Sequence, residues 1–395
     1  MKTKRIGTFM LMAIAIFAVT HAPLALASRG FKNSWTFMVY LDADNNLDSY
    51  GLLNLQQMSI GLSPEADVNV VVLMDRLAQP AYVYKVTHNN IQIVLSLGEV
   101  DMGSTETLAW FVEYAMENYA SKYYLLDMWD HGGGYRGVCW DESSGKHLSP
   151  HDIETALATA EKKVSRKIDI VGFDACLMGM IEVCYELKDV ANIVIGSEML
   201  IPGYGWPYEN LMQYLSANPN VDPYTFSKEI VTEYVSYYES MQSTYFVQLS
   251  AINEAYVPEM AKGLNAFADY LSRNINEYKG VIAEARGASQ QKFIMGTMGA
   301  YYYIDLYKFT SIVMENTSDK MLDNLALTLM GSIDKMVFCE DHISPQGNLD
   351  AKQYGLTINF PPNKEAYNPN YETYVQCFTT ETTWLNFLMT YYKNI

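Results

Sequence analysis

Short apolar runs alternate with amphipathic stretches through the first half of the chain, and this alternation limits the possible folds more than any other feature. Trp35–Leu41, Val68–Met74 and Tyr123–Trp129 each have the length and the β-branched or aromatic content of a buried strand. Ile168–Phe173 and Asn192–Gly196 continue the series. This succession predicts an α/β fold with a mainly parallel sheet and helices on both faces.

Helices are expected between these strands. Leu47–Met58 has a helical pattern, and Ser104 opens a second helix whose apolar residues recur at three- and four-residue spacing. Ser149 and Pro150 form a strong helix start, because Ser caps the free backbone N–H groups and Pro suits the first helical position. A further helix is expected to begin near Met178.

The sequence patterns of the remaining helices and strands are less regular. We expect a hairpin at a sheet edge and, in the second half of the chain, three helices and two strands. In chain order, the hairpin is Tyr82–Thr87 with Ile91–Leu97, the helices are Pro223–Tyr238, Val257–Leu271 and Met321–Val337, and the strands are Tyr245–Ile252 and Tyr354–Phe360.

The first 27 residues have the three parts of a secretory signal peptide. Lys2, Lys4 and Arg5 form a basic start, Phe9–Val19 is a short apolar run, and Ala27 ends a small-x-small cleavage signal. A membrane anchor is the alternative, but it needs about 20 apolar residues. The sequence therefore predicts a secreted or periplasmic protein that has no membrane association once the signal is removed.

The net charge of the chain limits the classes of partner that it can bind. The chain has 27 Lys and Arg against 45 Asp and Glu, a formal charge of −18, and removal of residues 1–27 leaves 24 against 45, or −21. A nucleic-acid surface needs clustered cations to displace the counterions of the phosphates, so this class of partner is excluded. Basic peptides or proteins are the partners that the charge favours.

The chain has five cysteines, an odd number that leaves at least one without an intramolecular partner. An exported protein with a free thiol can use it chemically, whereas the alternative for each cysteine is a small buried apolar side chain. The five are Cys139, Cys176, Cys184, Cys339 and Cys377.

A nucleophile and a base follow two of the predicted core strands. His131 lies just beyond Trp129 and is followed by three glycines, and Cys176 lies just beyond the strand that ends at Phe173. If these strands are neighbours, both side chains emerge at one sheet edge, where functional residues of α/β proteins collect. A helix starting near Met178 would lower the pKa of the thiol. A catalytic pair is predicted, with a buried cysteine and a loop histidine as the alternative.

The segments around these residues resemble the clostripain family of cysteine peptidases. The resemblance is carried by Tyr-Leu-Leu-Asp-Met-Trp-Asp-His131-Gly-Gly-Gly and by Asp174-Ala-Cys176-Leu-Met-Gly, and weaker matches extend over nearly the whole mature chain. It implies a caspase-like three-layer α/β/α sandwich, shared with caspases, gingipains and legumains, plus a C-terminal α/β region. The expected division is residues 1–27, 28–220 and 221–395, with a soft second boundary.

The resemblance implies a Cys–His dyad. Cys176 would attack the scissile carbonyl, and His131 would protonate the leaving amine and then activate water. Backbone N–H groups of Cys176 and of Gly132 or Gly133 would bind the oxyanion. No third catalytic residue is required, and Asp130 is interpreted as a loop-capping carboxylate.

Family members generally cleave after Arg or Lys, which implies an acidic specificity pocket. Asp174 matches the acidic position before the nucleophile and could pair with a guanidinium. Trp206 belongs to the matching Gly-x-Gly-Trp segment, but Pro207 stands where a second acid is common, and Glu209 follows two residues later. Specificity for an uncharged residue, with Asp174 as a structural carboxylate, remains an alternative.

Many relatives are nicked between the dyad residues, after a basic residue. Lys146 lies in a polar loop between His131 and Cys176 and is the predicted site of self-processing of such a precursor.

Calcium is used in this family, but the sequence does not place a site for it. Asp42–Leu53 resembles an EF-hand loop and fails at two required positions, and His147 and His151 lack the spacing of a zinc pair on one helix. No metal ligands are therefore assigned, and calcium stays a possible cofactor.

Two other classes of function stay open. A non-catalytic caspase-like binding module would require that His131 and Cys176 do not meet. A glycoside hydrolase would be consistent with the acidic and aromatic composition, but the sequence contains no motif for it.

Overall fold

The computed structural model describes residues 33–242, 245–291, 301–343 and 353–395. The predicted signal peptide, residues 1–27, lies outside these ranges. Residues Lys32–Ile395 form one compact unit, and the expected boundary near residue 220 stays a prediction. Within the described ranges, each helix is either too short or too polar to cross a bilayer.

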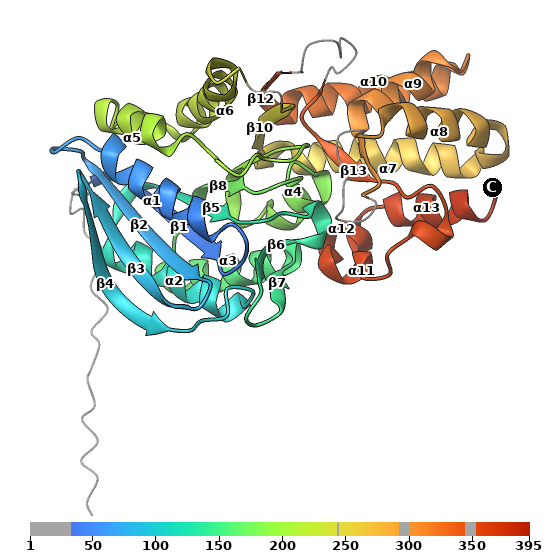
Figure 1. The fold of residues 1–395 in the computed structure, drawn as a ribbon. Coiled ribbons are helices and arrows are strands. Elements are labelled where there is room, and N and C mark those ends of the chain that lie inside the picture. The colour runs from blue at the N-terminus through green and yellow to red at the C-terminus, as the bar shows by residue number, and fades with distance from the viewer. Residues whose placement is uncertain (1–32, 243–244, 292–300, 344–352) are drawn as a thin grey trace, which may run out of the picture. The chain divides into compact units, whose positions relative to one another are not determined.

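A nine-stranded sheet runs through the described part of the chain in the order β12-β10-β9-β8-β5-β1-β2-β3-β4 (Figure 1). The five central strands, β9 to β2 in this order, are parallel, and the strands at both edges are antiparallel. The predicted parallel core and the edge hairpin β3–β4 are thus confirmed. The strands are β1 Asn33–Ala43, β2 Val68–Arg76, β3 Gln79–Thr87, β4 Asn90–Gly98, β5 Ser121–Trp129, β8 Ile168–Asp174, β9 Ala191–Gly196, β10 Val247–Asn253 and β12 Val337–Ile343.

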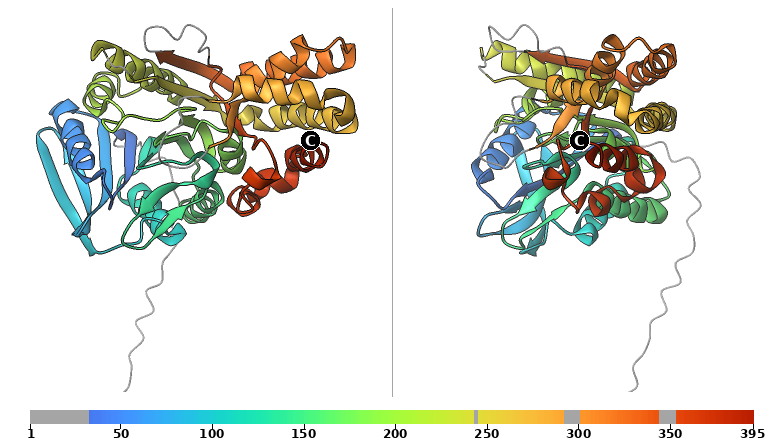
Figure 2. Two further views of the ribbon diagram at one scale, coloured as in Figure 1. Left: turned by 45° about the vertical axis from the view of Figure 1, so that its right-hand side comes forward. Right: turned by 90° about the vertical axis from the view of Figure 1, so that its right-hand side faces the viewer.

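Side chains of the central strands alternate between two apolar layers. In β1, Met38 and Tyr40 pack with α2, α3 and α4, whereas Phe37 and Val39 pack with α1, α5 and α6. The views in Figure 2 show these helices on opposite faces, which confirms the three-layer arrangement. The helices are α1 Asp48–Gly61, α2 Thr105–Asn118, α3 Pro150–Val164, α4 Ile181–Leu187, α5 Tyr208–Ala217 and α6 Pro223–Ser240.

Two of the predicted helix starts are confirmed and one is wrong. Ser104 caps α2, and Ser149 forms a capping box at the start of α3. In contrast, α4 begins at Ile181 rather than near Met178. The cause is the backbone of the preceding loop: Leu177 and Gly179 donate their N–H groups to the loop that follows β9, not to a helical turn.

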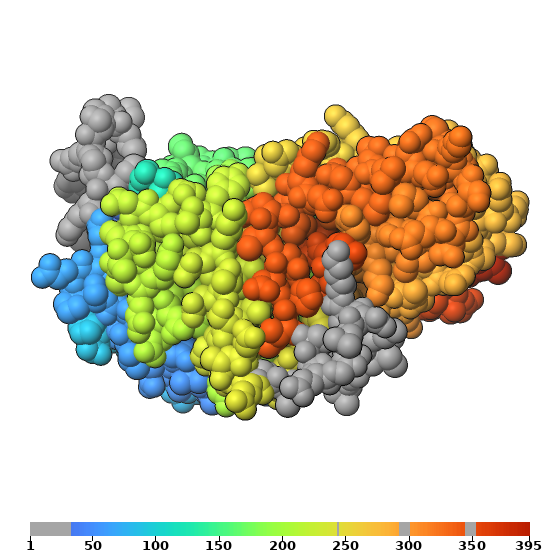
Figure 3. Space-filling model, turned by 90° about the horizontal axis from the view of Figure 1, so that it is seen from above, coloured from blue at the N-terminus to red at the C-terminus, as the bar shows by residue number. Residues whose placement is uncertain are grey.

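The C-terminal region shares the apolar layer of α2–α4, and its strands β10 and β12 extend the main sheet. The predicted helix Met321–Val337 ends at Met336, where the chain turns into β12. Seen from above, β12 lies between α6 and α10 (Figure 3). The further helices are α7 Val257–Arg273, α8 Ile275–Ser289, α9 Leu306–Glu315, α10 Lys320–Met336, α11 Tyr371–Tyr374, α12 Gln376–Glu381 and α13 Trp384–Tyr392.

Short elements complete the described fold. Two small two-stranded sheets are formed by β6 with β7 and by β11 with β13, and β13 is shorter than the predicted strand Tyr354–Phe360. The elements are β6 Val138–Asp141, β7 Lys146–Leu148, β11 Tyr303–Asp305, β13 Thr357–Asn359 and the 3-10 turns η1 Gly134–Arg136, η2 Glu254–Tyr256 and η4 Lys364–Ala366.

Candidate active site

Strand register brings the two predicted catalytic loops together. β5 and β8 are parallel neighbours, and Trp129 at the end of one pairs with Asp174 at the end of the other. The N–H of Asp130 also donates to the carbonyl of Asp174. His131 and Cys176 each follow this paired position by two residues. They therefore leave the same sheet edge side by side, as the sequence predicts.

Gly132 lies directly against the nucleophile loop. A Cβ atom at this position would be 2.2 Å from the carbonyl oxygen of Cys176 and 2.7 Å from its nitrogen, so no side chain can be accommodated without a shift of the backbone. A backbone hydrogen bond from Gly132 also reaches the Cys176 thiol and acts to lower its pKa. The first glycine after His131 thus permits the close approach of the two loops.

The Cys176 thiol is held by the backbone of Ile201. The sulfur accepts from the Ile201 N–H at 3.2 Å, and the thiol donates to the Ile201 carbonyl at 3.7 Å. Burial raises the pKa of Cys176 to about 11, although the Ile201 N–H acts in the opposite direction. The predicted lowering of this pKa by a helix N-terminus is wrong, because α4 begins five residues after the cysteine.

His131 contacts a residue that the sequence analysis did not select. Its Nε2 lies 2.6 Å from Oδ1 of Asn46, which belongs to the loop between β1 and α1. Burial lowers the pKa of His131, while the charge of Glu142 acts to raise it. The end of β1 adjoins the end of β5 in the sheet, so the loop after the first strand was the available signal for this contact.

Asp130 holds the loop behind His131. Its Oδ1 accepts from the side-chain amide of Asn45 at 2.7 Å, and its Oδ2 accepts from the N–H of Trp140 at 2.5 Å. The carboxylate is buried and has no direct contact with the thiol among these hydrogen bonds. This is the loop-capping role that the sequence analysis expects.

Both backbone groups of Gly133, the second glycine after His131, form hydrogen bonds. The N–H of Gly133 donates to the carbonyl of Gly137 at 2.8 Å, and its carbonyl accepts from the Tyr303 hydroxyl at 2.5 Å. An N–H that is already bonded within its loop is not free for an oxyanion. The structure thus distinguishes Gly133 from Gly132, whose N–H is directed at the sulfur.

Asp174 is buried beneath the nucleophile loop. Its Oδ2 accepts from the N–H of Trp206 and from the hydroxyl of Tyr208, both at 2.8 Å. Its Oδ1 is buried and has no hydrogen-bond partner among the described residues. Burial raises the pKa of Asp174 to about 7. One carboxylate oxygen of Asp174 is therefore hydrogen-bonded, and the other has no hydrogen bond to the described residues.

The other residues predicted for the specificity pocket, Trp206 and Glu209, lie in different environments. The Trp206 indole is fully buried against Gly172, so it is the backbone of Trp206 that holds Asp174. Gly205, with φ of 67°, has no room for a Cβ beside Asp174. Glu209 lies in the first turn of α5, and its carboxylate accepts from the side chain of Gln213.

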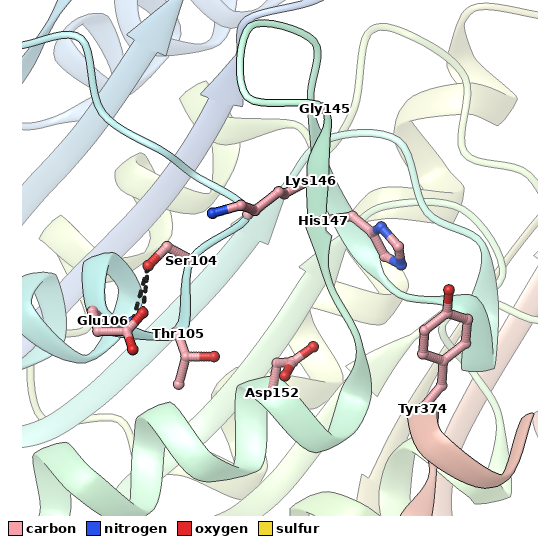
Figure 4. Close-up of a pocket in the computed structure, with 9 residues that line it drawn as sticks. Ser104, Thr105, Glu106, Gly145, Lys146, His147, Asp152 and Tyr374 are labelled. Carbon is pink, nitrogen blue, oxygen red and sulfur yellow. Dashed lines mark hydrogen bonds between the residues drawn. The ribbon is translucent and has the colours of Figure 1, made fainter. Parts of the chain in front are cut away.

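Lys146 is the first residue of β7, in a tight hairpin with β6. Its side chain is 63% exposed and pairs with Asp101 at 2.5 Å. The hairpin borders a surface pocket of about 420 Å³ that also includes Ser104 and Glu106 at the start of α2 (Figure 4). The predicted processing residue thus lies at the surface, but its backbone is part of a strand.

The C-terminal region secures the nucleophile loop as well as the histidine loop. The N–H of Thr357 in β13 donates to the carbonyl of Gly179 at 2.9 Å, and the same residue forms a bridge with Met180. Glu182 at the start of α4 accepts from the N–H of Asn359 at 2.8 Å. Residues beyond 300 therefore position both loops.

Comparison with known proteins connects this geometry to one family. The sequence pattern of the Clostripain family (Peptidase_C11) matches residues 39–391. A curated relative, clostripain of Hathewaya histolytica, is 26% identical, with 89% of this chain and 79% of the relative covered.

Two solved structures have a similar fold. An inactive zymogen C11 protease from Parabacteroides distasonis aligns with a TM-score of 0.67 and 18% identity over 90% of this chain and 98% of its own. A secreted C11 cysteine protease from Bacteroides thetaiotaomicron, in complex with an irreversible peptide inhibitor, aligns with a TM-score of 0.66 and 19% identity over 88% and 98%. The family match covers almost the entire described chain, and the chain therefore belongs to the clostripain family and is a cysteine endopeptidase.

Proposed function

We propose that this endopeptidase works through a dyad of Cys176 and His131. The observation that supports the dyad is the in-register pair of Trp129 and Asp174, from which both side chains follow at the same distance along their strands. The close approach of Gly132 to the Cys176 backbone adds to this support. Cys176 attacks the scissile carbonyl, and His131 transfers the thiol proton to the leaving amine before it activates water.

In the proposed dyad, the two nitrogens of His131 have different roles. When Nε2 carries the proton and donates it to Asn46 Oδ1, Nδ1 of the neutral ring keeps its lone pair. Burial raises the pKa of Cys176 and lowers that of His131, so both groups are neutral in the resting enzyme at pH 7. Proton transfer from sulfur to Nδ1 then accompanies the attack on the peptide instead of preceding it.

The oxyanion is proposed to bind the N–H groups of Cys176 and Gly132. Gly132 supports this role because its backbone contacts the nucleophile directly. Gly133 joins the oxyanion hole only if its hydrogen bond to Gly137 opens.

Active-site labelling tests the dyad. Full-length protein, Cys176→Ala and His131→Ala are treated with a peptidyl chloromethyl ketone or with iodoacetamide, and the modified residue is located by mass spectrometry. The dyad predicts labelling at position 176, its loss in Cys176→Ala, and a fall in its rate of at least about 100-fold for the peptidyl reagent in His131→Ala. Equal labelling rates with and without His131 would favour a non-catalytic binding module.

Cleavage after Arg or Lys is proposed from Asp174. Its uncommitted, buried Oδ1 is an acceptor that a guanidinium or ammonium group of the substrate can use. The alternative, specificity for an uncharged residue, is favoured by the pKa of about 7, because a protonated Asp174 carries no charge. Peptides that differ only at the residue before the cleaved bond decide between the two: a preference of less than about tenfold for Arg and Lys would reject basic specificity.

Export and self-processing are proposed on sequence and surface features. The predicted signal peptide gives a mature protein that starts at Ser28, and N-terminal sequencing of protein collected outside the cell tests this. Lys146 supports self-cleavage because its side chain is exposed. Active protein should yield two fragments split after Lys146, and Cys176→Ala should stay intact. An identical mass for both proteins after incubation would contradict self-processing.

A further inference from the structure

A histidine, a glutamate and a cysteine from three different helices meet where the end of the chain packs against α3 and α4. His151 lies in the first turn of α3, Glu186 in the last turn of α4, and Cys377 at the start of α12. One ligand atom from each of these side chains lies within 4.8 Å of the other two. A nitrogen, an oxygen and a sulfur donor are thus brought together.

The carboxylate of Glu186 contacts both of the other side chains. Its Oε2 lies 3.1 Å from Nδ1 of His151, and the thiol of Cys377 forms a hydrogen bond with the same carboxylate. Its Oε1 accepts from the N–H of Phe378 at 2.8 Å. A backbone group therefore fixes the orientation of this carboxylate, as the outer hydrogen bonds of metal-binding carboxylates do.

The three side chains differ in exposure. The side chain of Glu186 is fully buried, that of His151 is 30% exposed, and Cys377 is half-buried. The group therefore has a closed inner side and an outer side that an ion and a water molecule can reach.

The buried carboxylate of Glu186 has no permanent positive charge paired with it. Its ion-pair partner within the described ranges is the ring of His151, which is charged only when it is protonated. The nearby ammonium group of Lys188 lies 3.5 Å from Asp189 and 3.7 Å from Glu381. A buried carboxylate is costly unless it is paired or coordinates a cation, so a divalent ion would be stabilising here.

The geometry points to a zinc site formed by His151, Glu186 and Cys377, with water as the fourth ligand. Imidazole nitrogen, carboxylate oxygen and thiolate sulfur are the ligands that Zn²⁺ takes in tetrahedral sites. A coordinated thiol loses its proton, so the charges of the thiolate and the carboxylate together balance that of the ion. Ca²⁺ and Mg²⁺ prefer sets of oxygen ligands, which this group does not offer.

The observed distances are close to those of a zinc site. Zinc bonds of about 2.0–2.3 Å place the ligand atoms of a tetrahedral site about 3.3–3.6 Å apart. The nitrogen–oxygen distance of 3.1 Å is near this range, and the 4.8 Å limit for all three atoms leaves only a small change of side-chain torsions to be made. The spacing of His147 and His151 excludes a zinc pair on one helix, but it does not test ligands that come from other helices.

The ion would join the end of the chain to α3 and α4. The five cysteines, all within the described ranges, form no disulfide, so a metal crosslink would do here what disulfides do in many secreted proteins. A neighbouring contact has the same direction: the hydroxyl of Tyr371 in α11 donates to Glu182 at the start of α4 at 2.8 Å. Binding of the ion does not depend on the proposed catalytic dyad.

Binding is tested on the full-length Cys176→Ala protein, in which the proposed dyad has no thiol for a metal. The reduced protein is treated with EDTA, which is removed by gel filtration, and is then titrated with Co²⁺ without oxygen. We expect about one Co²⁺ per chain, the thiolate-to-cobalt absorption in the near ultraviolet, and the visible bands of tetrahedral Co²⁺. Zn²⁺ should remove both signals by displacement. Absence of the thiolate absorption would overturn the site.

Thermal unfolding of the same protein measures binding of zinc itself. A hundredfold excess of Zn²⁺ over its Kd should raise the Tm by about 3–5 °C. The increase should be absent when Cys377→Ser is added, and an equal increase in both proteins would contradict the proposal.

Two variants and a control locate the ion. Cys377→Ser should remove the thiolate absorption and weaken Zn²⁺ binding at least about 100-fold, and His151→Gln should weaken it at least about tenfold. Cys339→Ser replaces another half-buried thiol, in β12, and should bind like the parent. Thiolate absorption that persists in Cys377→Ser would place the ion on another cysteine. Should Cys377→Ser fold poorly, parent-like affinity in His151→Gln would equally overturn the site.

Hydrogen exchange tests whether the ion secures the end of the chain. Zn²⁺ should slow amide exchange in α12 at least about tenfold in the Cys176→Ala protein and leave it unchanged when Cys377→Ser is also present. Equal exchange with and without Zn²⁺ in a protein that binds the ion would overturn the crosslinking role.

Discussion

The imidazole of His131 is joined to the side chain of Asn46 by a contact of 2.6 Å between Nε2 and Oδ1, across 85 positions of sequence. Asn46 does not touch the thiol in the described contacts, so within the proposed dyad its role is to position His131. When Nε2 carries the ring proton, its bond to Oδ1 leaves the lone pair on Nδ1.

Replacement of Asn46 by Ala should lower kcat about 10- to 100-fold with little change in KM, because the base is misoriented while the specificity pocket is untouched. Steady-state kinetics over pH 5–9 measure this, and the acidic limb of the kcat profile should shift. Asn324→Ala, on an exposed face of α10, is the matched control. A loss of Tm with unchanged kinetics in the Asn46 variant would indicate a purely structural role.

The thiol of Cys176 should react slowly at neutral pH with a small neutral alkylator. Because burial raises its pKa to about 11, the reactive thiolate is scarce below that pH in the enzyme without substrate. The iodoacetamide rate, measured by mass spectrometry, should therefore keep rising between pH 7 and 9.5. A plateau from pH 6 upward would show a preformed thiolate–imidazolium pair and contradict the neutral resting state.

Addition of one methyl group at Gly132 should stop catalysis. The Cβ of Gly132→Ala would lie 2.2 Å from the Cys176 carbonyl oxygen, so the two loops must separate, with an expected loss of about 1–3 kcal/mol of stability and at least 100-fold in kcat/KM. Gly280→Ala is the control: its position in α8 is open, and Ala there should stabilise the protein by up to about 1 kcal/mol. Wild-type kinetics in Gly132→Ala would contradict the close approach of the loops.

The Tyr303 hydroxyl supports the histidine loop from the C-terminal region, through its hydrogen bond to Gly133. Tyr303→Phe removes this bond and keeps the ring, so we expect about 1 kcal/mol of destabilisation and a moderate fall in kcat. Urea unfolding and steady-state kinetics measure the two effects. Tyr301→Phe, which changes a neighbouring ring of the same segment, is the comparison, and equal kinetic effects in both variants would contradict a specific role for the Gly133 contact.

Glu182 makes stability depend on pH. Burial raises its pKa to about 7, so the folded protein keeps a proton that the unfolded chain releases near pH 4.5. This contribution is complete below pH 4 and is lost as the pH rises through about 7. Between pH 4.5 and 7, the parent should therefore lose up to about 3 kcal/mol relative to Glu182→Gln. Exposed Glu117→Gln is the control, and parallel pH curves for parent and Glu182→Gln would contradict the raised pKa.

The buried parallel strands near the site could be predicted because β-branched runs such as Val68–Met74 and Ile168–Phe173 have few alternatives. The order of these strands comes from the structure. The sequence predicts that His131 and Cys176 leave one sheet edge if their strands are neighbours, and the pairing of β5 with β8 meets this condition.

Contacts between segments that are far apart in the sequence could not be predicted from local sequence patterns. The hydrogen bond from Ile201 to the Cys176 sulfur depends on the path of a loop. The loop after Cys176 forms hydrogen bonds with the segment after β9 instead of entering a helix directly. The carboxylates of Glu99 and Asp141 meet Asp44 only because the edge hairpin and β6 fold back toward the end of β1. No periodicity in the sequence encodes such distances.

Tyr303 and Thr357 secure the loops of His131 and Cys176 from near the end of the chain. During synthesis, the proposed nucleophile and base therefore leave the ribosome well before the strands β11 and β13 that hold their loops. A nascent or truncated chain that ends before β13 contains both residues of the proposed dyad but lacks the contacts of Thr357. Packing of the loops that carry the proposed dyad is in this way coupled to the synthesis of β11 and β13, which come after both loops in the chain.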